Sequence, residues 1–220
     1  MIDYSLYLVT DRSLSLGRTT VNIVRAAVAG GVTCVQLREK SCPTKAFIEE
    51  ARALKALLDC LETPIPLIIN DRLDVAMAIG ADGIHLGQSD MALADARRLV
   101  GTTMCIGISA ESLEDALRAE AEGADYIGIS PVFATPTKND TAPPLGLDGI
   151  RRIRAAVQLP LVGIGGIHQE NAGAVIRAGA DGVAVVSAIV SAACPRSAAS
   201  ALKQQIHSAR EEEHPPWNTL

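Results

Sequence analysis

Aromatic side chains, paired cysteines and excess positive charge are all scarce in this chain of 220 residues. Aromatic residues make up 3% of the sequence, which leaves few side chains for the base-stacking surfaces that bind single-stranded nucleic acid. The formal net charge of -5 argues against broad electrostatic binding to nucleic acid or to anionic membranes. Any anion site must therefore be a local cluster of cations, and we expect neither nucleic acid nor membrane among the partners.

Disulfide frameworks, membrane spans and targeting segments are also not indicated. The five cysteines are odd in number and form no C-x-x-C pair, so neither a disulfide scaffold nor a zinc site is expected. No uninterrupted apolar run is long enough to cross a bilayer. The first residues, Met1-Ile2-Asp3-Tyr4, lack the basic and apolar regions of a signal peptide. We therefore expect a cytoplasmic protein.

What the chain does contain is a regular alternation of eight apolar strand-like runs with eight helical patterns, which predicts a parallel sheet. A short motif recurs at intervals of about 50 residues, and each copy ends a helix and opens a strand. The copies are Gly30-Gly31-Val32, Gly80-Ala81-Asp82-Gly83, Gly123-Ala124-Asp125-Tyr126 and Gly179-Ala180-Asp181-Gly182. Each interval holds two βα units, so the chain divides into four similar quarters.

We predict a (β/α)8 TIM barrel as a single domain over residues 1–210, followed by a flexible tail over residues 211–220. A doubly wound open sheet is the alternative, but it gives no reason for the fourfold spacing, and no G-x-G-x-x-G opens the first helix. The last predicted helix follows the eighth strand and runs through about Ala209.

The active site of this barrel lies at the carboxyl ends of its strands, so the polar residues directly after each apolar run are the candidates. Polar residues end strands in any protein, but here many converge on one rim. They are Gln36, Arg38, Lys40, Asn70, Asp71, Gln88, Asp90, Ser109, Thr135, Thr137, Lys138, Gly163, Gly165, Gly166 and Ser187.

Gln36, Arg38 and Lys40 alternate along one strand end and therefore project from the same face. A guanidinium beside an ammonium suits a multiply charged anion, above all a diphosphate. The alternative is a strand end whose cations are solvated or paired with carboxylates.

Asp71 and Asp90 follow neighbouring strands, and two carboxylates with phosphate oxygens and waters are a usual ligand set for Mg²⁺. The alternative for these aspartates is helix capping.

A second phosphate site is predicted where the last two strands run into helices. The glycine-rich stretch from Val162 to Ile167 and the stretch from Ala184 to Ser187 occupy the corner where this barrel often binds phosphate on backbone N–H groups. Close strand–helix packing also uses glycine and is the alternative. The long, proline-rich connection from Pro131 to Leu147 is predicted to be a lid over the barrel mouth.

No protein nucleophile is indicated. His85 lies within a strand and is interpreted as a packed core histidine, and Tyr7 and Tyr126 are likewise expected to pack in the core. The chain shows no Ser-His-Asp set with supporting motifs and no lysine inside a strand as a Schiff-base candidate. The chemistry is therefore expected to depend on electrostatic stabilisation.

These stretches together resemble thiamine-phosphate synthase, from about Tyr7 to about Val190. The motifs that carry the resemblance are Tyr7-Leu8-Val9-Thr10-Asp11, Val35-Gln36-Leu37-Arg38-Glu39-Lys40, Ile69-Asn70-Asp71-Arg72, His85-Leu86-Gly87-Gln88-Ser89-Asp90, Thr135-Pro136-Thr137-Lys138 and Val162-Gly163-Ile164-Gly165-Gly166-Ile167. The resemblance implies a transferase that joins a hydroxymethylpyrimidine diphosphate to a thiazole phosphate and releases diphosphate.

The resemblance also implies a role for each site residue. The pyrimidine substrate and its diphosphate would be held by Gln36, Arg38, Lys40, Asn70, Ser109 and Lys138, of which Arg38, Lys40, Ser109 and Lys138 would be catalytic. Mg²⁺ would be bound by Asp71 and Asp90, and the thiazole phosphate by Thr135, Thr137, Gly166, Val186 and Ser187. Glu111 departs from the family pattern, which often has His or Thr shortly after Ser-Ala.

Two other functions stay open at this point. A thiazole tautomerase of the same superfamily would bind the thiazole phosphate without needing the diphosphate and Mg²⁺ cluster. A non-catalytic barrel that senses thiamine phosphate would need an exposed apolar patch for a protein partner. A homo-oligomer is possible with any of these functions.

Overall fold

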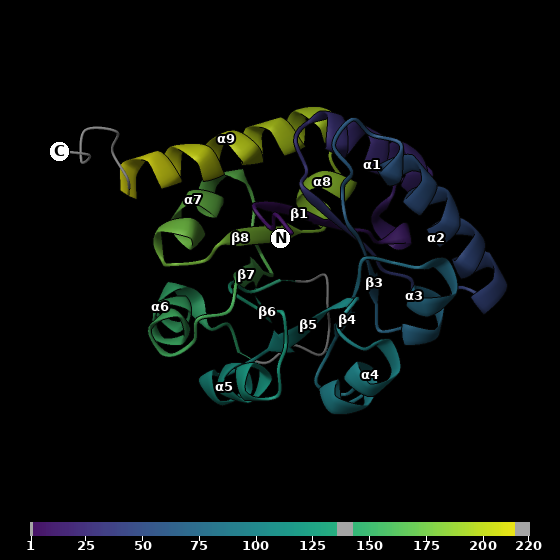
Figure 1. Cartoon of the computed structure of the whole chain (residues 1–220). Helices are drawn as coiled ribbons and strands as arrows, with labels where there is room; N and C mark the ends of the chain where they lie inside the picture. Colours follow the sequence, from purple (N-terminus) through teal and green to yellow (C-terminus); the bar gives the residue numbers. More distant parts are fainter. Residues whose placement is uncertain (1, 136–142, 214–220) are drawn as a thin grey trace.

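The computed structural model describes residues 2–135 and 143–213. Parallel strands in sequence order close into a barrel, with β8 pairing back onto β1 (Figure 1). The strands are β1 (Leu6–Val9), β2 (Cys34–Leu37), β3 (Leu67–Asn70), β4 (Gly83–Leu86), β5 (Cys105–Ala110), β6 (Tyr126–Ile129), β7 (Leu161–Ile164) and β8 (Gly182–Val185). The predicted (β/α)8 barrel is confirmed, and the open sheet is excluded.

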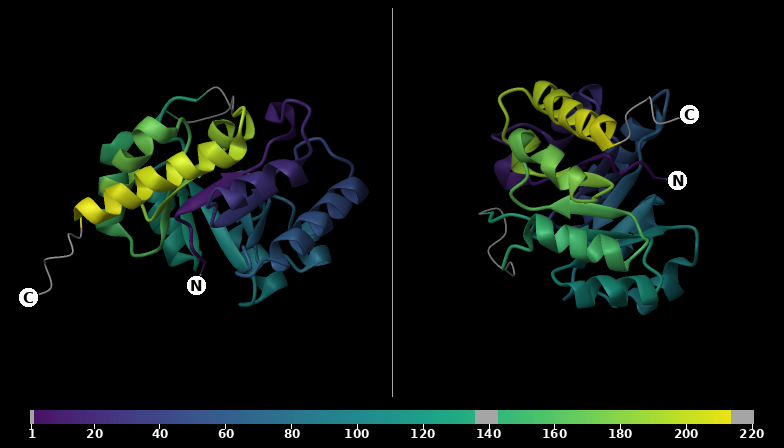
Figure 2. Two further views of the ribbon diagram at one scale, coloured as in Figure 1. Left: turned by 90° about the horizontal axis from the view of Figure 1, so that it is seen from above. Right: turned by 90° about the vertical axis from the view of Figure 1, so that its left-hand side faces the viewer.

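Helices surround the barrel on all sides (Figures 1 and 2). They are α1 (Thr20–Ala29), α2 (Thr44–Asp59), α3 (Leu73–Ile79), α4 (Leu93–Val100), α5 (Leu113–Ala121), α6 (Gly146–Ala156), α7 (Gln169–Arg177), α8 (Ser187–Val190) and α9 (Pro195–Glu213), with a 3-10 turn η1 (Arg12–Leu14). Helix α9 packs against both α1 and α7 and so completes the ring. Within the described residues, no helix has the length and apolar character needed to cross a membrane.

The strands are buried on both faces because the helices cover the outside and side chains fill the inside. The larger core lies between barrel and helices and includes Leu8, Leu37 and Phe47. A separate cluster fills the barrel interior, where Tyr4, Tyr7 and Tyr126 pack together. This double burial explains why the strands appear in the sequence as continuous apolar runs rather than alternating ones.

The fourfold sequence motif has a structural basis at the amino-terminal end of the barrel. In each quarter, the side chain of the residue directly before the even-numbered strand accepts a hydrogen bond from a backbone N–H near the start of the odd-numbered strand before it. These bonds run from Leu6 to Thr33 Oγ1 (3.0 Å), Leu67 to Asp82 (2.8 Å), Ile106 to Asp125 (2.7 Å) and Leu161 to Asp181 (2.8 Å). The motif therefore joins neighbouring strands far from the predicted site.

A cation from the helix that precedes each strand pair forms an ion pair with the aspartate of this motif in three of the four quarters. Lys55 of α2 lies 3.4 Å from Asp82, Arg97 of α4 lies 2.6 Å from Asp125, and Arg154 of α6 lies 3.1 Å from Asp181. Helix and strand pair are thus held together in three successive quarters. The repeat is a scaffold device, which leaves the opposite end of the barrel free to vary in chemistry.

The end of the chain differs from the prediction of one helix through Ala209. Two helices follow β8, with a break before Pro195, and α9 continues to Glu213. Proline has no backbone N–H and favours the first position of a helix, so a new helix begins there. Helix α9 thus extends three residues beyond the expected domain end at 210. Residues 214–220 of the expected tail lie outside the described residues.

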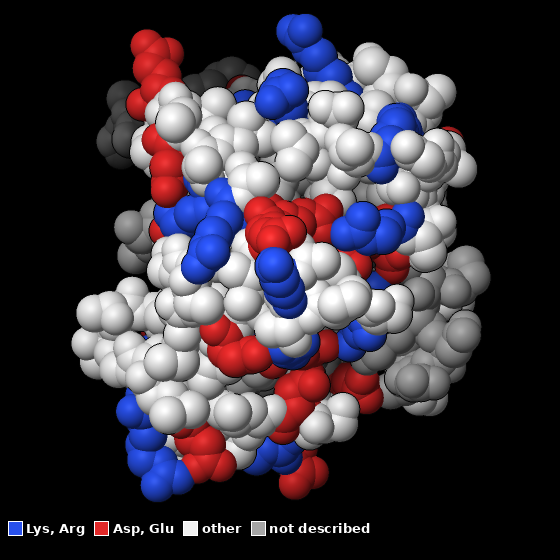
Figure 3. Space-filling model, turned by 90° about the vertical axis from the view of Figure 1, so that its right-hand side faces the viewer, with Lys and Arg blue, Asp and Glu red and all other residues white. Residues whose placement is uncertain are grey.

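Acidic and basic side chains are interspersed over the face drawn in Figure 3, and no extended field of one sign covers that face. Several of the charges are paired locally on the surface, as Arg72 is with Asp74 at 2.6 Å. This arrangement agrees with the expectation from net charge that anion binding is confined to a local cluster.

Candidate active site

A cavity of about 1030 Å³ opens at the carboxyl ends of the strands. All but one of the described candidate residues line this cavity. They are Gln36, Arg38, Lys40, Asn70, Asp71, Gln88, Asp90, Ser109, Thr135, Gly165, Gly166, Val186 and Ser187. The exception is Gly163, where a Cβ would lie 2.7 Å from Val175 of α7, so close strand–helix packing accounts for this glycine. Thr137 and Lys138 lie outside the described residues, as do all of residues 136–142 of the predicted lid. The geometry thus assembles the predicted side chains in one place, while their individual roles stay predictions.

Arg38 is held in position by the loop after β1. Its guanidinium donates to the carboxylate of Asp11 at 2.6 Å, and its backbone N–H donates to Thr10 Oγ1 at 3.0 Å. Asp11 also accepts the backbone N–H of Ser13 and so caps η1. The pair is largely shielded, with exposed fractions of 21% for Arg38 and 13% for Asp11. Asp11 belongs to the Tyr7–Asp11 motif, but its role in holding Arg38 was not predicted.

Lys40, Asp71 and Asp90 form a polar cluster at one side of the cavity mouth. The ammonium of Lys40 lies 2.5 Å from Asp71 Oδ2, and Asp90 Oδ2 accepts the backbone N–H of Gly87 at 2.7 Å. Neither α3 nor α4, the helices that follow these aspartates, has a side-chain cap. Helix capping therefore does not account for Asp71 and Asp90.

The two carboxyl groups interact with each other, and their pKa values move in opposite directions. Burial alone would raise the pKa of Asp71, but hydrogen bonds with Lys40 and Asp90 outweigh it and hold that pKa below its ordinary value. Burial and the bond with Asp71 raise the pKa of Asp90, against the opposing effect of the Gly87 N–H. Two like charges this close favour a shared proton or a bound cation.

Asn70 presents an unused donor to the same side of the cavity. Its side chain is 7% exposed, and Nδ2 has no hydrogen-bond partner among the described residues. A buried amide nitrogen without an acceptor is unfavourable by about 1–3 kcal/mol. The arrangement is therefore suited to an acceptor oxygen supplied by a ligand.

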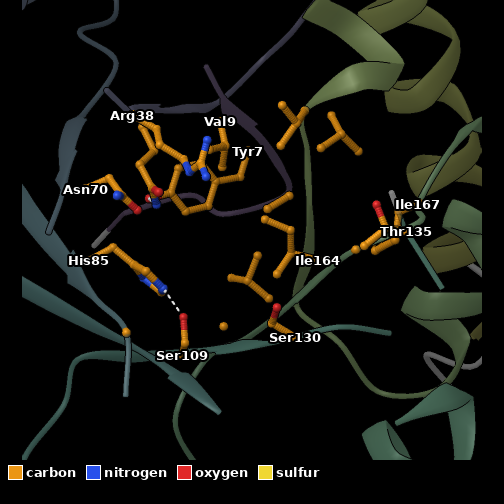
Figure 4. Close-up of a pocket in the computed structure, with 18 of the residues that line it drawn as sticks. Tyr7, Val9, Arg38, Asn70, His85, Ser109, Ser130, Thr135, Ile164 and Ile167 are labelled. Atoms are coloured by element: carbon orange, nitrogen blue, oxygen red, sulfur yellow. Dashed lines mark hydrogen bonds between the residues drawn. The ribbon is translucent and has the colours of Figure 1, made fainter. Parts of the chain in front are cut away.

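The opposite side of the cavity is built from glycine. Gly165 and Gly166 have φ values of 99° and 64°, in the left-handed region. A Cβ on Gly166 would lie 2.7 Å from the carbonyl oxygen of Ala134, so the turn packs directly against the segment that carries Thr135. Figure 4 shows Thr135 and Ile167 across the cavity from Arg38, Asn70 and His85. The cavity thus has two separate polar corners.

The interpretation of His85 as a core side chain was wrong. His85 lines the cavity, where Nε2 lies 2.9 Å from Ser109 Oγ and Nδ1 lies 2.9 Å from the Tyr126 hydroxyl (Figure 4 shows the first bond). Tyr7 and Tyr126 are buried as predicted, but both also line the floor of the cavity. Burial of both strand faces hides this from the sequence, because inward and outward positions look alike.

A family model described as thiamine monophosphate synthase matches residues 6–189. The chain belongs to this family. It is 57% identical over 201 residues to the thiamine-phosphate synthase of Albidiferax ferrireducens, an alignment that covers 91% of each chain. It is 50% identical over 212 residues to the thiamine-phosphate synthase of Chloroflexus aurantiacus, covering 96% of this chain and 97% of that one.

A solved structure, the thiamine phosphate pyrophosphorylase from Pyrococcus furiosus, matches with a TM-score of 0.87 at 39% identity, covering 94% of this chain and 98% of the other. The 3-hexulose-6-phosphate synthase barrel matches with a TM-score of 0.69 at 17% identity, a likeness of fold alone. The resemblance drawn from the motifs is confirmed, and the cavity described above is the candidate active site of a thiamine monophosphate synthase family member.

Proposed function

We propose that this protein joins hydroxymethylpyrimidine diphosphate to thiazole phosphate, forming thiamine phosphate and releasing diphosphate. The observation that carries the proposal is the two-cornered cavity, with cations and carboxylates on one side and a glycine turn on the other. Membership of the thiamine monophosphate synthase family supports the same assignment.

The first corner suits the pyrimidine diphosphate. Arg38 and Lys40 provide a fork-shaped cation and a point charge, the combination that binds multiply charged phosphates. The free donor of Asn70 needs an acceptor, which a diphosphate oxygen provides. Gln36 and Ser109 line the deeper cavity, where we place the pyrimidine ring. Lys138 is proposed as a further cation for the same substrate.

The residues present fit a magnesium ion that arrives with the diphosphate. Asp71 and Asp90 supply two carboxylates that already interact, and a divalent cation relieves the repulsion between them. No group of three or more His, Cys, Asp or Glu side chains in the described ranges could hold a metal alone. Mg²⁺ commonly takes one or two carboxylates and completes its shell with phosphate oxygens and water. When bound, it would neutralise charge on the leaving diphosphate.

The second corner suits the thiazole phosphate. Gly166 presents its backbone without a side chain, and Ser187 begins α8 on the adjacent strand end. Backbone N–H groups at such a corner bind phosphate oxygens in many barrels of this type. Thr135, Thr137 and Val186 are proposed to complete the contacts around the thiazole substrate.

The reaction then needs positioned charge more than a protein nucleophile. The bond between the pyrimidine methylene carbon and the diphosphate oxygen breaks, and the electron pair leaves with diphosphate. Arg38, Lys40 and Lys138 stabilise the charge that develops on the leaving group. The methylene becomes cation-like, helped by electron donation from the ring amine, and the thiazole nitrogen attacks it to form the new carbon–nitrogen bond. Binding both substrates in one cavity supplies the required alignment.

The test is diphosphate release by the purified chain with each substrate alone and with both, in the presence and absence of Mg²⁺. Release that requires both substrates and Mg²⁺ is the expected result. Thiazole-phosphate binding without diphosphate release would contradict the proposal and favour a tautomerase, which has no need of the Arg38, Lys40, Asp71 and Asp90 cluster. Release without Mg²⁺ would remove the metal from the proposal while keeping the transferase.

A further inference from the structure

A continuous chain of hydrogen-bonded side chains crosses the floor of the cavity. Gln36 Nε2 donates to the Tyr7 hydroxyl at 2.9 Å, and the Tyr7 and Tyr126 hydroxyls lie 3.0 Å apart. Tyr126 then lies 2.9 Å from His85 Nδ1, and His85 Nε2 lies 2.9 Å from Ser109 Oγ. The chain passes through five strands and connects two residues that we place against the pyrimidine substrate.

Two glycines make room for the rings of this chain. A Cβ on Gly107 of β5 would lie 2.1 Å from Cζ of Tyr126, inside the phenol ring. A Cβ on Gly128 of β6 would lie 3.0 Å from Cε1 of His85. Neither glycine has a positive φ, so conformation does not explain them. The strands are thus built around the two rings, which fixes the distance between the Tyr126 hydroxyl and His85.

The direction of the hydrogen bonds follows from counting donors. The Gln36 amide nitrogen can only donate, so the Tyr7 hydroxyl accepts this bond and has one hydrogen of its own to give. The Tyr126 oxygen is a strong acceptor for it, whereas the nearby thiol of Cys34 is a weak one. Tyr126, having accepted from Tyr7, has its own hydrogen available for His85 Nδ1, which lies 2.9 Å from its hydroxyl.

This order gives Tyr7, Tyr126 and His85 one donor and one acceptor role each. Burial raises the pKa of Tyr7 and of Tyr126 well above the ordinary value, so both phenols stay protonated and able to donate. A neutral histidine that accepts at Nδ1 carries its hydrogen on Nε2. The Nε2–H then donates to Ser109 Oγ, and the serine hydrogen is left for the cavity.

We propose that Tyr126 is a positioning residue that fixes the Nε2–H tautomer of His85 and thereby turns the Ser109 hydroxyl hydrogen toward the cavity. The inference rests on the proposed function only in that the pyrimidine substrate accepts this hydrogen. In the opposite order, His85 Nδ1–H would donate to Tyr126, Ser109 would donate to Nε2, and the serine would offer the cavity a lone pair instead. Tyr126 thus determines whether Ser109 offers the cavity a hydrogen or a lone pair.

The tautomer can be measured without substrate by ¹⁵N NMR of the full chain labelled at histidine, with the His85 signals assigned by comparison with His85→Asn. The expected spectrum has a protonated Nε2 and an unprotonated Nδ1 for His85. In Tyr126→Phe the donor to Nδ1 is absent, so the spectrum is expected to move toward the other tautomer or a mixture. Tyr7→Phe is expected to keep the Nε2–H tautomer, since Tyr126 still donates.

Tyr4→Phe is the matched control. Tyr4 stacks on Tyr126 with ring centroids 4.5 Å apart, but its hydroxyl bonds to Cys105 Sγ and does not join the chain. This variant is expected to keep the His85 spectrum and to release diphosphate within about twofold of the wild-type rate. Tyr126→Phe is expected to lower kcat about three- to tenfold, the effect of one misdirected hydrogen bond, with the KM for thiazole phosphate unchanged.

A wild-type His85 protonated at Nδ1, or a tautomer that survives Tyr126→Phe, would overturn the inference. A wild-type chain that shows the expected tautomer but releases no diphosphate would instead contradict the proposed function, so the two failures are distinguishable. If Tyr126→Phe does not fold, the wild-type and Tyr7→Phe spectra still decide the direction of the chain.

Discussion

Replacing Asp71 by asparagine separates the proposed metal role of this residue from its structural role. Asp71 has a φ of 59°, in the left-handed region where a residue such as alanine is strained by about 1–2 kcal/mol. Asparagine tolerates this region and has nearly the same shape, so Asp71→Asn removes the charge and leaves the backbone unstrained. Asp71→Ala would mix the two effects.

The expected loss of stability is small. Lys40, the partner of Asp71, has a side chain that is 57% exposed, and exposed ion pairs contribute at most about 1 kcal/mol. Relief of the repulsion between Asp71 and Asp90 offsets part of this. For a chain of this size the melting temperature should fall by no more than about 4 °C.

The expected loss of turnover is much larger. Removing one electrostatic group that acts on a transition state typically lowers kcat by about 100- to 1000-fold, or about 3–4 kcal/mol. We expect Asp71→Asn to lose diphosphate release on this scale and to keep the wild-type Kd for thiazole phosphate, measured by calorimetry. Asp74→Asn is the control, because Asp74 lies three residues along the chain, pairs with Arg72 and does not line the cavity.

Two results would refute this reasoning. An equal loss of diphosphate release and thiazole-phosphate binding would show that the two corners are not separate sites. Undiminished release by a folded Asp71→Asn protein would show that the carboxylate pair does not hold a metal that the reaction needs.

Three further predictions concern the neighbouring parts of the site. Asp11→Ala should raise the KM for the pyrimidine diphosphate about tenfold, because Arg38 loses its 2.6 Å anchor, and steady-state kinetics with an unchanged KM would contradict this. Gly166→Ala should weaken the binding of thiazole phosphate at least about tenfold, because the added Cβ would lie 2.7 Å from the Ala134 carbonyl oxygen and φ is 64°. An equal loss of affinity for the pyrimidine diphosphate would argue against a local effect. Burial would raise the pKa of Asp115, but hydrogen bonds with Ser112 and Arg118 hold that pKa below its ordinary value. The ionised carboxylate therefore stabilises the folded state above about pH 4, and this stabilisation is lost as pH falls through the folded-state pKa. Asp115→Asn should therefore lower the unfolding free energy by about 1 kcal/mol at neutral pH and make no difference in acid, as urea titrations at several pH values can check.

The positions of the site residues along the chain were predictable because the barrel brings one kind of position together. Once strands and helices alternate, every strand ends at the same rim, so Asn70, Asp71 and Asp90 could be placed near Arg38 from order alone. Side chains alternate between the two faces at the end of β2, so Arg38 and Glu39 point to opposite sides. Arg38 lines the cavity, whereas Glu39 does not and pairs with Arg12. Both inferences use local rules that hold whatever the rest of the fold does.

Contacts between inward-facing side chains could not be predicted in the same way. Tyr7 and Tyr126 are 119 residues apart and meet only because the barrel closes. Each lies in a strand that is apolar on both faces, so no alternation marks which side chains point to the axis. The same difficulty applies to His85, which was assigned to the core although it turns toward the cavity.

The sequence by itself determined the alternation of strands and helices, the four quarters and the set of rim residues, since these depend on periodicity and on short motifs. The tertiary structure decided which side chains touch at the site: Asp11 with Arg38, Asp71 with Asp90, and the hydrogen-bonded chain from Gln36 to Ser109. The physical reason is that these contacts depend on the direction of side chains inside a closed barrel. That direction is set by the tilt and register of all the strands together.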